Sequence, residues 1–268
     1  MIKVGTSGFS YPDWVGPFYP PGTRQPAMLS WYARHFDALE INFTYYRLPA
    51  PGQLEAMSAR CADRVIFAVK VWQGMTHTFD ASAAELAGFT AALAPLSERG
   101  VLGAVLLQFP GSFRPSAAAN RRLVGLVSRL RPFPVVAEFR HRSWVCEETF
   151  RLLRAEGVGY CCVDEPQLPG LIPPVAVATA DTAYVRFHGR NAVKWFQHEQ
   201  PHERYDYLYG IDELAGWVPR LRQLDDSAAR TLVFMNNHYE AKAVTNARQL
   251  KELLAAGSPV LCCPIDPG

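Results

Sequence analysis

The sequence predicts an α/β protein folded as a single (β/α)₈ barrel of the TIM type, and three observations lead to this prediction. Runs rich in strand-forming residues alternate with stretches of helical period, an order that gives a parallel sheet with helical crossovers. These runs number eight, which is the number of strands that closes such a barrel. The chain has 268 residues and no linker-like stretch. Because the fold typically takes about 250 residues, we expect residues 1–268 to form one domain.

The predicted strands are short runs of β-branched, aromatic and other apolar residues, bounded by turn-forming residues. They cover residues 2–6, 38–44, 65–72, 102–109, 135–140, 159–164, 183–188 and 231–237. Since long connections separate them, consecutive strands should run parallel.

The predicted helices carry apolar residues three and four positions apart among good helix formers. They cover residues 27–36, 53–61, 83–96, 117–130, 147–155, 213–224 and 242–255. The sixth crossover, residues 166–182, contains four prolines, which disfavour a helix interior, so we predict an irregular crossover there. Residues 191–210 follow the seventh strand and are rich in aromatic and charged side chains. This composition is typical of a loop over an active site, although a surface excursion is the alternative.

The composition excludes several classes of protein. Lys and Arg total 27 against 25 Asp and Glu, a net charge of +2, which is too small for the broad basic surface of a dedicated nucleic-acid binder. The six cysteines form no CxxC pair, so we expect reduced thiols and a cytoplasmic protein. The sequence contains neither a secretion signal nor an apolar run of about 18 residues, so we expect no membrane association.

Charged and polar side chains occupy strand positions that should face the barrel interior. In the second strand Glu40, Asn42 and Thr44 alternate with apolar residues, which predicts that the polar set points inward. The same alternation places further polar residues inside: Lys70, Gln108, Glu138, Arg140, Asp164, Arg186 and His188. An unpaired buried charge costs several kcal/mol, so these groups must pair, face water or meet a ligand. Most lie near the carboxyl ends of their strands, where barrel enzymes build active sites. A closed ion-pair network is the alternative.

The ends of the seventh and eighth strands favour an anionic ligand, because barrels often bind phosphate there. Gly189 permits close backbone approach and Arg190 could hold an anion with two hydrogen bonds. Arg140 and Arg142 add two guanidinium groups after the fifth strand. The alternative is that these arginines pair with nearby carboxylates, namely Glu138, Asp164 and Glu165.

Metal chemistry has weaker support in the sequence. His198 and His202 match the HExxH spelling of zinc proteases, but Pro201 lies between them and disfavours the helix which that site requires. Carboxylate and imidazole groups from several strands could still hold a divalent cation, namely Glu40, Glu138, Asp164, His188 and His238. We predict no metal ligand but keep this set as an alternative.

The chain resembles the YecE-like family, also called domain of unknown function 72, whose members are TIM barrels. The resemblance covers nearly every strand end from Gly5 to about Asn246. It rests on the segments Gly5-Thr6-Ser7-Gly8-Phe9-Ser10-Tyr11, Glu40-Ile41-Asn42, Thr44-Tyr45-Tyr46, Phe67-Ala68-Val69-Lys70, Leu107-Gln108-Phe109-Pro110, Glu138-Phe139-Arg140-His141-Arg142-Ser143-Trp144, Val185-Arg186-Phe187-His188-Gly189-Arg190 and Asn236-Asn237-His238. The resemblance implies the fold but supplies no activity, substrate or cofactor.

Our first functional hypothesis is an enzyme that acts on a small anionic substrate, bearing phosphate or carboxylate, by general acid/base chemistry. Glu40 or Glu138 serves as general base with a raised pKa, and His188 or Lys70 completes the proton transfer. Substrate contacts are expected from residues at the strand ends: Thr6, Asn42, Tyr45, Gln108, Arg140, His141, Asp164, Arg186, Arg190, Asn236, Asn237 and His238.

Two other functions stay open. One is metal-assisted phosphodiester cleavage on nucleic acid, with bases stacked on aromatic side chains. These would be Trp14, Tyr45, Tyr46, Trp144 and Trp195. The other is a non-enzymatic module that binds a metabolite in the same pocket. The sequence indicates no particular cofactor and no oligomeric state.

Overall fold

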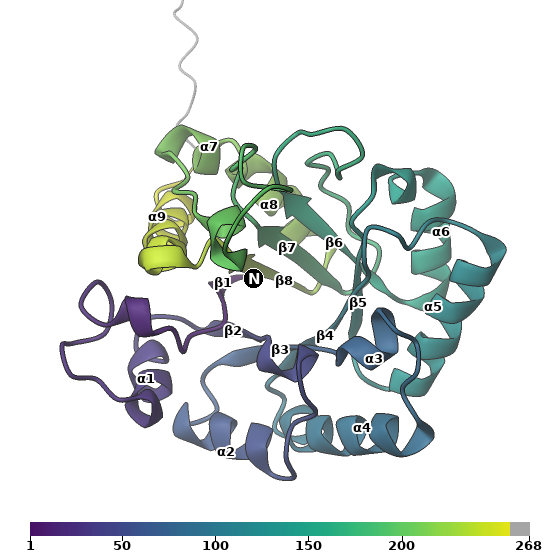
Figure 1. The fold of residues 1–268 in the computed structure, drawn as a ribbon, viewed down its shortest axis with the longest axis horizontal. Helices are drawn as coiled ribbons and strands as arrows, with labels where there is room; N and C mark the ends of the chain where they lie inside the picture. Colours follow the sequence, from purple (N-terminus) through teal and green to yellow (C-terminus); the bar gives the residue numbers. More distant parts are fainter. Residues whose placement is uncertain (258–268) are drawn as a thin grey trace, which may run out of the picture.

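Eight parallel strands close into a barrel in which each strand pairs with its neighbour in sequence and β8 returns to β1 (Figure 1). The structure is a computed structural model that describes residues 1–257. The strands are β1 (Ile2–Ser7), β2 (Ala38–Ile41), β3 (Ile66–Lys70), β4 (Leu102–Gln108), β5 (Val135–Glu138), β6 (Gly159–Asp164), β7 (Thr182–Phe187) and β8 (Arg230–Met235). The predicted barrel fold and its strand order are confirmed.

The helices surround the barrel (Figure 1). They are α1 (Gln25–Tyr32), α2 (Gln53–Arg60), α3 (Gln73–Thr76), α4 (Ala83–Glu98), α5 (Ala117–Leu130), α6 (Glu147–Glu156), α7 (Ile211–Ala215), α8 (Val218–Ser227) and α9 (Lys242–Ala255). The stretch predicted as one helix over 213–224 is two helices, because Pro219 lies in the first turn of α8, where proline starts a helix. Between β6 and β7 the described chain forms no helix, which confirms the irregular sixth crossover.

Short 3₁₀ helices follow several strands and shape the mouth of the barrel. They are η1 (Pro12–Trp14), η2 (Phe43–Tyr45), η3 (Arg142–Trp144), η4 (Pro201–Tyr205) and η5 (Tyr239–Ala241). Strand β2 ends at Ile41, before the predicted residue 44, because the chain turns there into η2. Side chains such as Tyr45 are thereby carried over the barrel end instead of continuing along the sheet.

The excursion after β7, residues 191–210, contains η4 and is fixed by hydrogen bonds of its own. The Asn191 amide donates to the backbone oxygens of Glu203 and Asp206, at 3.1 Å each. The Nε of Arg204 donates to the backbone oxygen of Trp195 at 2.7 Å. These contacts give the excursion a defined shape at the barrel mouth.

Apolar side chains fill the layer between strands and helices. On the β4–β5 side, Phe109 and Phe113 stack with ring centroids 4.3 Å apart, and Phe139 and Trp144 stack at 4.2 Å. All four side chains are buried. Within the described residues no helix is long and apolar enough to cross a membrane. The four cysteines described are free thiols, whereas Cys262 and Cys263 lie outside the described residues.

Two glycines allow a matched test of this packing. A methyl group at Gly5 would lie 1.9 Å from the backbone oxygen of Ala38, its partner on β2, whereas one at the exposed Gly125 of α5 meets nothing within 4 Å. We expect Gly5→Ala to lower the free energy of unfolding by about 1–3 kcal/mol or more, because the barrel must deform to accept the added methyl group. Gly125→Ala should raise it by about 0.5–1 kcal/mol. Urea unfolding of both variants tests the close approach, and equal effects would contradict it.

Candidate active site

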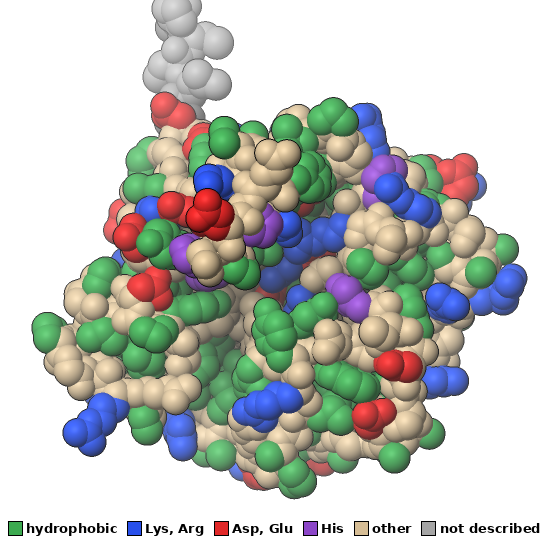
Figure 2. All heavy atoms as spheres, in the orientation of Figure 1, with side chains coloured by type: hydrophobic (Ala, Val, Ile, Leu, Met, Phe, Trp, Pro, Cys, Tyr) green, Lys and Arg blue, Asp and Glu red, His purple; other side chains and the backbone are tan. Residues whose placement is uncertain are grey.

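Two cavities open side by side at the carboxyl ends of the strands. The first cavity has a volume of ≈ 370 Å³ and the second a volume of ≈ 380 Å³. Figure 2 shows Lys and Arg side chains at the bottom of the hollow in the middle of this face, with histidine at its rim. Predicted site residues that line one or both cavities are Glu40, Asn42, Tyr45, Lys70, Gln108, Arg140, Arg186, Asn236 and His238.

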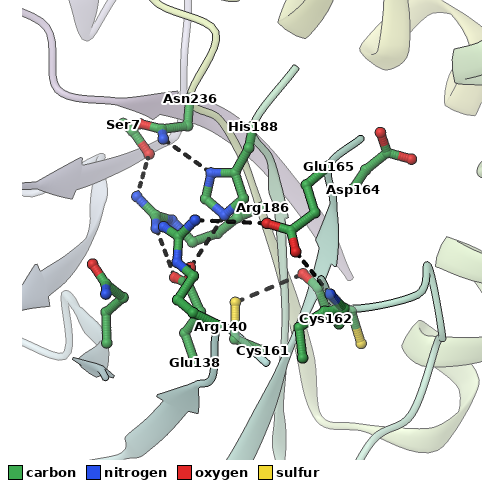
Figure 3. Close-up of polar contacts among 12 residues, drawn as sticks. Ser7, Glu138, Arg140, Cys161, Cys162, Asp164, Glu165, Arg186, His188 and Asn236 are labelled. Atoms are coloured by element: carbon green, nitrogen blue, oxygen red, sulfur yellow. Dashed lines mark hydrogen bonds and ion pairs between the residues drawn. The ribbon is translucent and has the colours of Figure 1, made fainter. Parts of the chain in front are cut away.

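The floor of the first cavity is built around the Arg186 guanidinium (Figure 3). Its Nη1 donates to Glu138 Oε2 at 2.6 Å, and its Nη2 donates to Glu40 Oε1 at 2.7 Å. The Arg186 side chain is 3% exposed and both carboxylates are fully buried. One cation from β7 therefore bridges two anions that come from β2 and β5.

Strand register brings further donors to Glu40. Ser7 lies opposite Glu40 in the β1–β2 pair, and its hydroxyl donates to Glu40 Oε1 at 2.6 Å. The Tyr184 hydroxyl, two residues before Arg186 on β7, donates to Glu40 Oε2 at 2.6 Å. Both carboxylate oxygens are thus satisfied by protein groups. The alternation of Tyr184 with Arg186 and His188 could have identified this tyrosine from sequence.

The pKa values of the two carboxylates move in the direction opposite to the sequence prediction. Burial alone raises the pKa of Glu40, but Arg186 and the two hydroxyl donors outweigh it, so the pKa lies below its usual value. Burial likewise opposes ionisation of Glu138, yet Arg140, Arg186 and His188 hold its pKa well below the usual range. The prediction of a general base with a raised pKa is therefore wrong for both residues, because each is neutralised by a guanidinium.

His188 is a neutral part of this network. The Asn236 amide donates to its Nδ1 at 3.0 Å, so the proton is on Nε2, which donates to Glu138 Oε1 at 3.1 Å. Burial, assisted by the nearby Arg140 charge, lowers the pKa of His188 to about 3. His188 thus positions Glu138 at neutral pH and is poorly suited to the proton transfer predicted for it.

Lys70 ends β3 and lines both cavities. Its Nζ donates to Gln108 Oε1 at 2.8 Å and lies 4.1 Å from the centroid of the Tyr45 ring. No carboxylate oxygen of the described residues lies within 4.0 Å of this ammonium. Burial lowers the pKa of Lys70 to about 7, and the charge of Arg186 acts in the same direction. The amine therefore gains and loses its proton near neutral pH.

Arg140 lies between the network and the second cavity. Its Nε is 2.8 Å from Glu138 Oε1, an ion-pair distance without hydrogen-bond geometry, and its Nη1 is 3.7 Å from Glu165 Oε2. Its side chain is 14% exposed. Glu165 lines the second cavity and accepts a hydrogen bond from the Ile172 backbone N–H at 2.9 Å. Burial raises the pKa of Glu165 to about 7 against the opposing effect of Arg140. Glu165 was not among the predicted site residues.

Asp164 faces the helix layer, so the prediction that it points into the barrel is wrong. Its carboxylate accepts two hydrogen bonds from Arg190, at 2.7 and 2.8 Å, and one each from Tyr209 and Trp217. Figure 3 shows it pointing away from Arg186. Arg190 also donates to Glu213 at 2.8 Å, and it lines neither cavity. Its guanidinium is therefore engaged in the pairing weighed as the alternative to anion binding.

Three other predicted residues serve the surrounding structure. The Thr6 hydroxyl donates to the Gly8 backbone oxygen at 2.6 Å. His141 Nδ1 accepts from the backbone N–H of Ser143 at the start of η3. The Asn237 amide donates to Asn246 and to the Tyr207 backbone oxygen, at 2.8 Å each. Lining residues that the sequence did not single out as contacts include Tyr11 and Tyr205.

The alternative of a metal-assisted nuclease finds no matching arrangement. The described residues contain no group of three or more His, Cys, Asp or Glu side chains placed to hold a metal ion. Glu40 and Glu138 face guanidinium groups, and Asp164 points to the opposite side of the sheet. Of the proposed stacking residues, Trp14 and Trp144 are buried and donate to backbone oxygens, so they are not available to bases.

Comparisons with known proteins show the family to which this chain belongs. The family model described as a protein of unknown function, DUF72, matches residues 3–264. The chain belongs to the DUF72 family. This DUF72 chain is 31% identical over 270 residues to UPF0759 protein YunF of Bacillus subtilis, with 95% of each chain covered.

Solved structures of two DUF72 proteins match this DUF72 chain closely. The protein from Thermotoga maritima has a TM-score of 0.87 and 38% identity, with 95% of this chain and 99% of that chain covered. The protein from Enterococcus faecalis has a TM-score of 0.85 and 25% identity, with 95% and 96% covered. The predicted family is confirmed, and the comparisons give it no activity.

Removing the central cation of the DUF72 site should invert the pH dependence of stability. In the native protein Glu40 has a lowered pKa, so its stabilisation is present above the unfolded pKa and is lost as the pH falls through the folded one. In Arg186→Met burial dominates and raises the folded pKa of Glu40, so stability should fall as the pH rises above the unfolded pKa. We expect a loss of about 3–5 kcal/mol at pH 7, and a smaller loss at pH 5.

Urea unfolding at pH 5 and pH 7 measures this difference. Adding Glu40→Gln to Arg186→Met should recover part of the stability at pH 7, because the unpaired buried charge is gone. A loss that is the same at both pH values, with no recovery in the double variant, would show that Arg186 acts by packing alone.

Proposed function

We propose that this DUF72 protein is an enzyme that binds a small anionic substrate, bearing phosphate or carboxylate, and moves a proton through Lys70. The observation that carries the proposal is the position of Lys70. Its ammonium lines the cavities at the strand ends, and no carboxylate of the described residues lies within 4.0 Å of it. A partly desolvated cation without a counter-ion favours an anion from solution.

The charge balance of the site supports anion binding. Glu40 and Glu138 balance Arg140 and Arg186 through the contacts in the cavity floor. Lys70 then adds a positive charge that the protein does not neutralise. Arg140 and Arg186 also line the first cavity, so a bound anion would meet the potential of three cations at one place. The anion should raise the pKa of Lys70 and bind with uptake of a proton.

The proposed chemistry uses two groups with pKa values near neutrality. The Lys70 amine accepts or donates a proton near neutral pH, because burial lowers its pKa to about 7. Glu165, whose pKa burial raises to about 7, lines the second cavity beside Arg140. An amine and a carboxyl group that titrate in the same range are matched to general acid/base chemistry. His188 and Glu138 hold Arg140 and Arg186 in place.

Sulfate is a suitable probe of the anion site, because its charge is constant between pH 6 and pH 9. We expect sulfate affinity to fall roughly tenfold as the pH rises from 6 to 8, since Lys70 loses its charge in this range. Lys70→Arg should bind sulfate with a smaller pH dependence, because Glu165, beside Arg140, still titrates in this range, and Lys70→Gln should bind weakly at every pH. Isothermal titration calorimetry measures all three. Wild-type affinity that is constant with pH, or unchanged in Lys70→Gln, would contradict the role of Lys70.

Turnover needs a separate test, because the binding experiment does not distinguish an enzyme from a metabolite-binding module. The protein is incubated with the anionic small-molecule fraction of a cell extract, and mass spectrometry identifies compounds that disappear. We expect the wild type to consume a compound that Lys70→Arg binds but leaves intact, because a guanidinium stays protonated. A compound that is captured and returned unchanged by the wild type would support the binding module and contradict the enzyme.

A further inference from the structure

The two cavities at the barrel mouth are parts of one cleft. They share six lining residues, Tyr45, Tyr46, Lys70, Gln108, Arg140 and Tyr205. Lys70 and Arg140, two of the three cations of the proposed anion site, thus lie at the junction. Since a group held at the junction borders both volumes, a ligand bound there can extend in two directions.

Each cavity also has walls of its own that are suited to flat apolar groups. In the first cavity the rings of Tyr11 and His238 stack with centroids 4.6 Å apart and an angle of 2° between their planes. Burial lowers the pKa of His238 to about 4, so this wall is uncharged at neutral pH. The second cavity is lined by Phe196, which is 64% exposed, whereas Trp195 beside it is buried, with 2% exposed. Aromatic walls bind flat rings by stacking and by burial of apolar surface.

We propose that the substrate has two arms joined by its anionic group, which lies at the junction over Lys70 and Arg140. One flat arm lies in the first cavity against Tyr11 and His238, and the other lies in the second cavity against Phe196. This inference rests on the proposed anion site and adds the shape of the substrate to it. The chemical class is a diester of phosphate, or an equivalent anion substituted on both sides. A substrate with a terminal anion would fill one cavity and leave the other to water.

Three phosphate diesters of equal charge test the inference: dimethyl phosphate, methyl phenyl phosphate and diphenyl phosphate. All carry one negative charge at neutral pH, so they differ only in the number of rings. We expect affinity to rise by about tenfold with each ring, because each ring finds its own aromatic wall. Calorimetry at pH 6.5, with dimethyl phosphate as the ring-free reference of equal charge and sulfate as a second ring-free anion, measures the series.

Variants of the two walls separate the arms. His238→Ala should remove the gain from the ring in the first cavity. Phe43 also lines this cavity, so Phe43→Leu is a second variant if the first folds poorly. Phe196→Ala should remove the gain in the second cavity. Val193→Ala is the matched control, because Val193 is 82% exposed in the same excursion and lines neither cavity. Dimethyl phosphate should bind equally to all of them.

The outcomes distinguish the two proposals. Two stepwise gains in the wild type, of which each wall variant keeps only one, support the two-armed substrate, because the remaining wall still binds one ring. If sulfate and dimethyl phosphate bind but only one ring or none adds affinity, the two-armed substrate is overturned and the anion site stands. If both gains persist in both wall variants, the rings bind elsewhere and the inference is likewise overturned. If neither ring-free anion binds, the proposed function and this inference fail together.

Discussion

The bridge that Arg186 makes between Glu40 and Glu138 is the interaction on which the rest of the site depends. Three ionised groups lie inside the barrel, where each alone would cost several kcal/mol. They are tolerated because the guanidinium presents separate nitrogen atoms to two carboxylates that arrive from different strands. In the observed register of the barrel all three charged groups are paired. The paired groups of the floor therefore lie directly beneath the residues of the mouth.

The floor also determines how the residues above it behave. Because Arg186 and Arg140 pair with the two carboxylates, the neighbouring Lys70 has no counter-ion within 4.0 Å among the described residues. Its burial and the charge of Arg186 lower its pKa below that of an ordinary lysine. Glu165 lies on the far side of Arg140 and keeps its proton more tightly than an ordinary carboxyl group. The groups with pKa values near neutrality thus lie at the margin of the network, whereas the two carboxylates at its centre have pKa values below their usual range.

The sequence predicted the barrel well and the site in part, for identifiable physical reasons. Alternation of polar and apolar residues is clear in β2 and β7, so Glu40 and Arg186 were correctly placed inside. The same alternation predicted the wrong orientation in β6. The inward-facing positions of that strand are apolar, and the polar Asp164 faces hydrogen-bond donors outside the barrel, Arg190 and Trp217. The sequence also could not predict which carboxylate meets which guanidinium, since partners lie on strands far apart in the chain. Without the partners, burial alone predicts a raised pKa for Glu40, the wrong direction.

The hydrogen bonds of Asp164 also fix the two ends of the excursion over residues 191–210. Asp164 holds Arg190, which immediately precedes the excursion, and Tyr209, which lies near the end of that excursion. A single carboxylate thus accepts hydrogen bonds from residues at both ends of the segment that carries Trp195 and Tyr205. The next residue in the chain is Glu165, which faces the second cavity. One peptide unit therefore joins the residue that holds the two ends of the excursion to the residue that lines the second cavity.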